Sequence, residues 1–183
     1  AAIYFDTIDH FSHGFINFHP PRPEWVDTDE YDLYHQVLSS GYILQDIFLG
    51  QLLEILPANT RIMLVSDHGF LTGDQRVRSI PMEPTGPAVQ HRHYGILVMN
   101  GKGIRHDERV YGASVLDVTP TLLAWMGLPV GADMDGKVLV QAFEHPPEIE
   151  RIPSWDEVEG ACGMHPPNQQ PDLKEATETL QHL

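Results

Sequence analysis

The first residues that could carry chemistry lie in an acidic, histidine-rich stretch near the start of the chain. Asp9 and His13 are four residues apart, so on a helical turn they project from the same face. One carboxylate oxygen and one imidazole nitrogen are suitable ligands for Zn²⁺ or Mn²⁺. Asp6 and His10 have the same spacing, so this stretch alone allows two registers. A helix start with Asp and Ser caps and solvated histidines explains the stretch as well.

Two further clusters of the same residue types follow later in the chain. Asp67 and His68 come after an apolar run, and Gly69 permits the sharp turn that would let both side chains face one ion. His91 and His93 lie on the same side of an extended segment. An Asx turn at a strand end and a surface pair of histidines are the alternative interpretations. Because all three clusters lie at predicted strand boundaries, the pattern favours a divalent metal site.

Strands that alternate with helices are expected to position these clusters. Short apolar runs predict strands at residues 1–5, 61–66 and 94–99. This alternation indicates an α/β fold with a mostly parallel sheet flanked by helices. In such sheets, functional sites form at the carboxyl ends of the strands, where the first two clusters lie.

Two helices are predicted between and after these strands. Apolar residues at three- and four-residue steps predict a helix over residues 30–56, with Asp29 as a plausible N-cap. The second helix is expected to begin near Ser114 or Thr119 and to end at Gly127.

Composition fits an ordinary globular protein and limits its partners. Apolar residues make up 42% of the 183 residues and aromatic residues 9%, which argues against disorder. A net charge of −15 repels nucleic acid and anionic membranes, so we expect neither a nucleic-acid polymer as partner nor a membrane segment. Cys162 is the single cysteine, which excludes an intrachain disulfide. Oligomeric state and compartment stay open, with a soluble, cytoplasmic protein favoured.

We predict two regions along the chain. Residues 1–140 contain the clusters and most of the predicted elements. Residues 141–183 are polar and rich in proline, and we expect an extended tail in which a helix starts near Asp172. Both ends look cut, because an apparent strand starts at Ala1 and the last residues stop within an apparent helix.

The order of these motifs resembles the alkaline phosphatase superfamily, and within it the type I phosphodiesterase / nucleotide pyrophosphatase branch. The resemblance covers about residues 1–140 and depends on three stretches: SDHGF at 66–70, GILVMNGKGI at 95–104 and SVLDVTPTLLAWMGLPVGADMDGKVL at 114–139. It implies the C-terminal part of a catalytic domain built as a three-layer sandwich, incomplete in this chain.

The same resemblance implies a hydrolase that cleaves phosphodiester or pyrophosphate bonds in small molecules with two divalent metal ions. These ions are commonly zinc, and manganese is possible. Asp9, His13 and His91 match the ligands of one ion, whereas Asp67 and His68 match those of the second.

By this alignment Asp6 and His10 are not ligands, and His93 is a neighbour of the substrate. The family pattern also requires a further Asp ligand and a Thr or Ser nucleophile, and neither has a match in this sequence. We expect both to precede Ala1, so the catalytic nucleophile is unknown and the fragment alone is expected to be inactive. A sulfatase, a relative that handles phosphonates or phosphoglycerate, and a non-catalytic binding domain are the alternatives.

Overall fold

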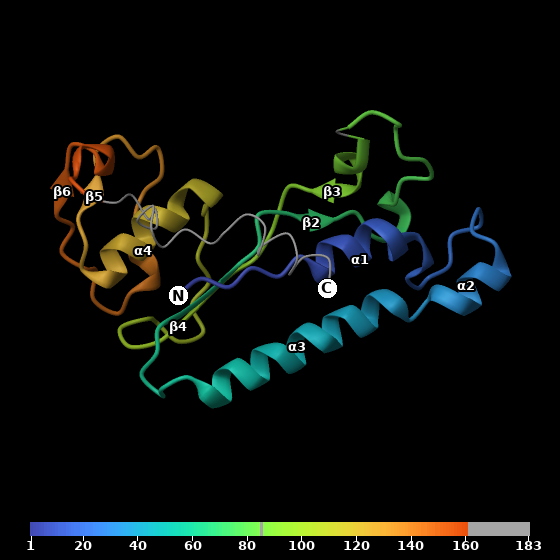
Figure 1. Cartoon of the computed structure of the whole chain (residues 1–183), viewed down its shortest axis with the longest axis horizontal. Helices are drawn as coiled ribbons and strands as arrows, with labels where there is room; N and C mark the ends of the chain where they lie inside the picture. Colours follow the sequence, from blue (N-terminus) through green and yellow to red (C-terminus); the bar gives the residue numbers. More distant parts are fainter. Residues whose placement is uncertain (85, 161–183) are drawn as a thin grey trace, which may run out of the picture. The chain divides into compact units, whose positions relative to one another are not determined.

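The chain forms two compact units, each with its own helices and small sheets (Figure 1). In the computed structural model, residues 1–84 and 86–160 are described. Unit 1 is Ala1–Asp107 and unit 2 begins at Glu108. Cys162 and the helix expected near Asp172 lie outside the described residues.

Three helices form one side of unit 1: α1 (Thr7–Phe15), α2 (Thr28–Tyr34) and α3 (Val37–Ile55). Helix α3 runs alongside α1 (Figure 1), and the ring of Phe11 packs where Gly41 lacks a side chain. A Cβ at Gly41 would lie 2.6 Å from Cδ2 of that ring, so glycine permits this close packing.

The predicted helix over residues 30–56 is present, but as α2 and α3 with a break at His35 and Gln36. Asp29 is not the N-cap. That role belongs to Asp27, whose Oδ1 accepts from the backbone N–H groups of Asp29 at 2.9 Å and Glu30 at 3.2 Å. The helix therefore begins earlier than expected, and Asp29 lies in its first turn, where its charge favours the helix dipole.

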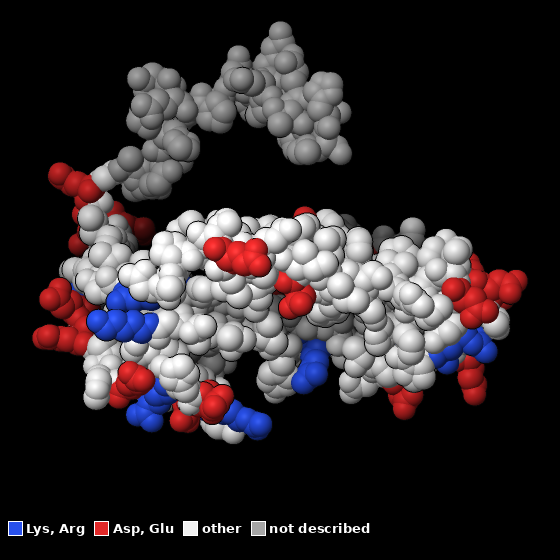
Figure 2. Space-filling view, turned by 90° about the horizontal axis from the view of Figure 1, so that it is seen from below, with Lys and Arg blue, Asp and Glu red and all other residues white. Residues whose placement is uncertain are grey.

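Helix α3 has two charged residues among its 19, Asp46 and Glu54. Figure 2 shows that charged groups are sparse over the middle of the face seen from below. Ile43 and Ile47 are exposed on this helix. None of the helices in the described residues combines the length and the apolar character needed to cross a membrane.

The sheets of unit 1 are small and antiparallel. Strand β1 (Ile62–Val65) pairs with β4 (Leu97–Asn100), and β2 (Gly69–Phe70) pairs with β3 (His91–Arg92). The expectation of a mostly parallel sheet is wrong for the described residues, in which the parallel pair is formed by β5 (Val130–Gly131) and β6 (Arg151–Ile152) of unit 2. Strand direction depends on distant pairing partners, which an apolar run does not specify.

The strand expected at residues 1–5 is also absent. This segment has no secondary structure in the described chain, and Ile3 and Tyr4 are exposed. The strand expected at 61–66 forms as β1, and the one expected at 94–99 forms as β4 but starts later, at Leu97. Asp67 and His68 follow shortly after β1, and His91 and His93 lie in the segment that precedes β4.

Arg76 joins the loop between β2 and β3 to the segment that follows α1. It is 7% exposed and lies in the long loop after β2, which also contains the 3-10 helices η2 (Gly73–Gln75) and η3 (Gly86–Gln90). Its guanidinium donates to the carbonyl groups of Ile16 at 3.1 Å, His19 and Pro21, in the turn that follows α1. Burial lowers the pKa of Arg76, but a guanidinium stays charged at neutral pH. Arg76 therefore ties this loop to the end of α1.

Unit 2 is built around α4 (Val118–Met126), as the sequence predicts. Ser114 caps the preceding 3-10 turn η4 (Val115–Asp117) in a reciprocal capping box with Asp117. Gly127 ends α4 in the left-handed conformation, with φ of 74°. The core contains Trp125, Leu139 and Phe143. Strand β5 (Val130–Gly131) pairs in parallel with β6 (Arg151–Ile152), followed by η6 (Trp155–Glu157), while η5 (Val140–Ala142) lies between the two strands.

Candidate metal centre

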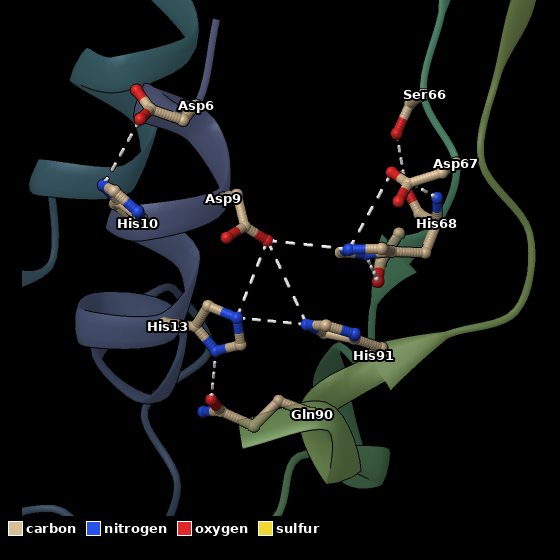
Figure 3. A network of polar contacts seen from close by, with 10 residues as sticks. Asp6, Asp9, His10, His13, Ser66, Asp67, His68, Gln90 and His91 are labelled. Carbon is tan, nitrogen blue, oxygen red and sulfur yellow. Dashed lines mark hydrogen bonds and ion pairs between the residues drawn. The ribbon is translucent and has the colours of Figure 1, made fainter. Parts of the chain in front are cut away.

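Asp9, His13 and His91 converge in unit 1 (Figure 3). Asp9 Oδ1 lies 3.6 Å from His13 Nε2 and 4.0 Å from His91 Nε2, and the two imidazole nitrogens are 3.0 Å apart. Helix α1 places Asp9 and His13 one turn apart, and His91 is the first residue of β3. The fold thus brings His91 next to Asp9 and His13, so that three potential ligand atoms lie within 4.8 Å of one another.

The polar environment of Asp9 fits a bound cation. Its Oδ1 atom is inaccessible to solvent and has no hydrogen-bond partner among the described residues. Around a tetrahedral Zn²⁺ with bonds of 2.0–2.1 Å, neighbouring ligand atoms would lie roughly 3.3 Å apart. The three separations observed here, from 3.0 to 4.0 Å, need only small side-chain movements to reach that geometry.

His68 and Asp67 lie at the edge of this group. His68 Nε2 is 3.7 Å from Asp9 Oδ1 and 3.8 Å from Asp67 Oδ1. Its ring stacks on that of His91, with centroids 3.7 Å apart and planes inclined by 15°. Asp67 is 76% exposed, and neither residue belongs to the compact group of three ligand atoms. The structure brings the five predicted ligands into one region, with three of them already convergent.

Phe70 supports all three histidine rings, a role that the sequence reasoning missed. The rings of His13, His68 and His91 form T-shaped contacts with the ring of Phe70, at centroid distances of 5.0, 5.7 and 5.2 Å. Edge-to-face contacts of this kind stabilise aromatic pairs and hold ring orientation. Phe70 belongs to the SDHGF stretch, but only the fold shows that it reaches His13 and His91.

Burial lowers the pKa of His91, and the neighbouring His68 and His13 rings lower it further. The neutral imidazole is therefore favoured at physiological pH. A histidine must be neutral to offer its lone pair to a metal ion, so this environment suits a ligand.

The alternative register on α1 does not reach the centre. Asp6 and His10 form their own contact at 4.0 Å, with side chains 51% and 70% exposed. Figure 3 shows this pair directed away from the other residues. His93 follows β3 and is exposed, outside the group of convergent side chains.

Gln90 is the second contributor that the sequence reasoning missed. It is 2% exposed, and its Oε1 lies 2.8 Å from His13 Nδ1. Gln90 directly precedes His91 in the sequence, which is the local feature that could have indicated a role at the site.

One comparison with known proteins bears on this centre. Residues 1–119 match the sequence profile of a family described as "Type I phosphodiesterase / nucleotide pyrophosphatase". The matched segment covers more than half of the chain and contains all five predicted ligands. No curated protein and no solved structure gave a significant match.

Proposed function

The chain belongs to the type I phosphodiesterase / nucleotide pyrophosphatase family, and from this premise we propose that it forms the metal-binding part of a hydrolase for phosphodiester or pyrophosphate bonds in small molecules. The observation that carries the proposal is the convergence of Asp9 Oδ1 with the Nε2 atoms of His13 and His91, where this carboxylate oxygen has no hydrogen-bond partner among the described residues. An anionic oxygen held against imidazole nitrogens is a favourable environment for a divalent cation.

In this proposal Asp9, His13 and His91 hold one ion, and Asp67 with His68 hold part of the coordination sphere of a second. Both ions are proposed to be zinc, with manganese as the alternative. When bound, such ions polarise phosphoryl oxygens and lower the pKa of a nucleophilic hydroxyl or water.

The residues of this chain would orient and protect that chemistry. The Asp9 carboxylate would balance part of the charge of the cation, and His13 and His91 would each donate a nitrogen lone pair to it. Phe70 restricts the histidine rings on one side. We propose that the Thr or Ser nucleophile, and the further Asp ligand of the second ion, are supplied by residues preceding Ala1 in a longer protein. His93 is proposed as a neighbour of the bound substrate.

Titration calorimetry on the metal-stripped 183-residue chain tests the metal centre. We expect Zn²⁺ to bind, and each of Asp9→Asn, His13→Gln and His91→Gln to weaken the affinity about tenfold or more, which corresponds to about 1.4 kcal/mol or more. Asp6→Asn and His10→Gln are matched controls, because Asp6, the N-cap of α1, and His10 have the same residue types and spacing but are exposed. A wild-type chain that binds neither Zn²⁺ nor Mn²⁺, or ligand variants that bind as the controls do, would refute the site.

The reaction is tested with a longer protein that contains this chain. We expect metal-dependent hydrolysis of bis(4-nitrophenyl) phosphate, and loss of that hydrolysis in His91→Gln but not in His10→Gln. Preferential hydrolysis of 4-nitrophenyl sulfate would overturn the phosphodiester assignment while leaving the metal centre in place.

A further inference from the structure

We propose that Gln90 is a positioning residue of the metal centre, whose side-chain carbonyl holds His13 in the tautomer that leaves Nε2 free to bind a metal ion. The inference rests on the proposed metal centre, but it concerns a residue outside the predicted ligand set. It predicts a property of the metal-free protein, namely which nitrogen of His13 carries the proton.

His13 is in contact with the side chain of Gln90 (Figure 3). Gln90 Oε1 lies 2.8 Å from His13 Nδ1, and an amide oxygen can only accept a hydrogen bond. Nδ1 of His13 must therefore donate. A neutral imidazole has a single N–H, so its Nε2 carries the lone pair. That nitrogen is the one that faces Asp9 Oδ1 at 3.6 Å.

The amide of Gln90 is held in place by its surroundings. Gln90 is the last residue of η3, it is 2% exposed, and its backbone carbonyl accepts from Leu71 N–H at 2.8 Å. A buried amide that lacks a hydrogen-bond partner is destabilising, so its bond to His13 is strongly favoured over an unpaired arrangement. Gln90 also directly precedes His91, so one short segment supplies a candidate ligand and the group that orients another.

His68 shows the same arrangement with a backbone group. Its Nδ1 lies 3.2 Å from the carbonyl oxygen of Gly69, so its Nδ1–H donates and its Nε2 is left facing Asp9 at 3.7 Å. Metal-binding histidines commonly donate their second ring N–H to a carbonyl or carboxylate, which fixes both tautomer and ring orientation. Gln90 fills this place for His13.

The first test is the affinity of the full 183-residue chain for Zn²⁺. We expect Gln90→Leu to weaken binding about 10- to 100-fold, the usual range for loss of an orienting partner. Gln90→Glu, which keeps an acceptor oxygen, should bind within a few-fold of wild type. Gln75→Leu is the matched control, because Gln75 is exposed in the same loop and should leave the affinity unchanged.

The second test reads the tautomer directly. Long-range ¹H–¹⁵N correlation spectra of the metal-free chain at about pH 8 should show the His13 proton on Nδ1 in wild type. In Gln90→Leu the proton should move largely to Nε2, and in Gln90→Glu it should stay on Nδ1. A merely structural role for Gln90 would weaken folding without producing this change.

Each outcome decides the proposal. Wild-type affinity in Gln90→Leu, or a proton on Nε2 of His13 in the wild-type chain, overturns it. If the wild-type chain binds no metal, the proposed function fails, while the tautomer in the metal-free chain still decides whether Gln90 orients His13. If Gln90→Leu does not fold, the wild-type tautomer and the Gln90→Glu affinity give the answer.

Discussion

At the scale of single residues, the least satisfied group of the centre is Asp9. Its Oδ1 is inaccessible to solvent and has imidazole nitrogens 3.6 to 4.0 Å away, too far for hydrogen bonds. A solvent-inaccessible carboxylate oxygen that accepts no hydrogen bond disfavours folding, and a cation placed between it and the histidines would remove that penalty. Metal binding and stability of unit 1 should therefore be linked.

The pKa of His91 gives a prediction of pH dependence. Burial and the neighbouring His68 and His13 lower this pKa in the folded chain, whereas an unfolded histidine titrates near pH 6.5. Between the lowered pKa and about 6.5, the unfolded state binds more protons, so the free energy of unfolding falls as the pH falls. We expect urea denaturation of the metal-free chain at pH 7.5, 6.5 and 5.5 to show this loss.

His91→Gln should reduce the dependence of stability on pH in this range, because the variant lacks the perturbed group. His10→Gln is the control, since His10 is exposed on α1 and should leave the dependence unchanged. An equal pH dependence in wild type and His91→Gln would contradict the prediction.

At the scale of elements, the end of β1 and the segment leading into β4 approach closely. The Ser66 N–H donates to the carbonyl oxygen of Ile96 at 3.0 Å, which extends the β1–β4 pairing toward Asp67 and His68. A Cβ on Gly95 would lie 2.6 Å from the carbonyl carbon of Ser66 and closer still to its oxygen. The backbone that carries two candidate ligands therefore requires glycine at position 95.

We accordingly expect Gly95→Ala to destabilise the chain by about 1–3 kcal/mol, the usual cost of overpacking a close contact. Because Asp67 and His68 directly follow Ser66, with which the new methyl group would clash, the substitution should also weaken binding of the proposed second metal ion. Gly14→Ala is the control: it lies on α1, a Cβ there meets nothing within 4 Å, and alanine favours a helix. Thermal unfolding and Zn²⁺ titration of both variants check this, and equal behaviour of the two would contradict it.

Much of the element pattern could be predicted because it is local. The periodicity of α3, the apolar run of β1, the Ser114 cap and the Gly127 stop are all features of consecutive residues. Strand direction could not be predicted, because the pairing of β1 with β4 joins residues more than thirty positions apart. The apolar run at residues 1–5 likewise could not reveal that none of the described strands pairs with it.

The candidate site divides in the same way. The residue types and spacing of Asp9, His13 and Asp67–His68 mark them as possible ligands in the sequence itself. The residue types of Gln90 and Phe70 do not mark them as site residues, and their places near His91 and His68 in the sequence do not show that they contact His13; only the fold shows these contacts.

At the scale of the whole molecule, all five predicted ligands lie in unit 1 and none in the described part of unit 2. We therefore expect Zn²⁺ to stabilise unit 1 selectively. A site in the folded state occupied at 100 times its Kd adds about 2.7 kcal/mol to the free energy of unfolding. Differential scanning calorimetry of the 183-residue chain should show two transitions, of which Zn²⁺ raises one.

Tryptophan fluorescence can assign that transition, because Trp125 is buried in unit 2 and Trp25 is half exposed in unit 1. In a variant with Trp25→Phe and Trp155→Phe, Trp125 is the single remaining tryptophan, so fluorescence reports the unfolding of unit 2. The midpoint of this unfolding transition should not change when Zn²⁺ is added. A single transition that shifts as a whole would show that the two units unfold together, contrary to this expectation.

The net charge of −15 also matters for a phosphoester substrate. An acidic surface repels an anionic ligand at long range, so attraction must come from local positive charge. Bound divalent ions at the centre would provide it, which makes substrate binding as well as chemistry dependent on the metal.

The compactness of the centre along the chain has a consequence for protein engineering. Asp9 and His13 belong to one turn of α1, and Gln90 and His91 are consecutive, so two short peptides contain the three proposed ligands and the proposed orienting group. A designed scaffold would need only one helical turn facing the first residue of a strand to reproduce the arrangement. Transplanting these two peptides together with Phe70 into an unrelated fold would therefore show whether the proposed ligands bind a cation without the rest of unit 1.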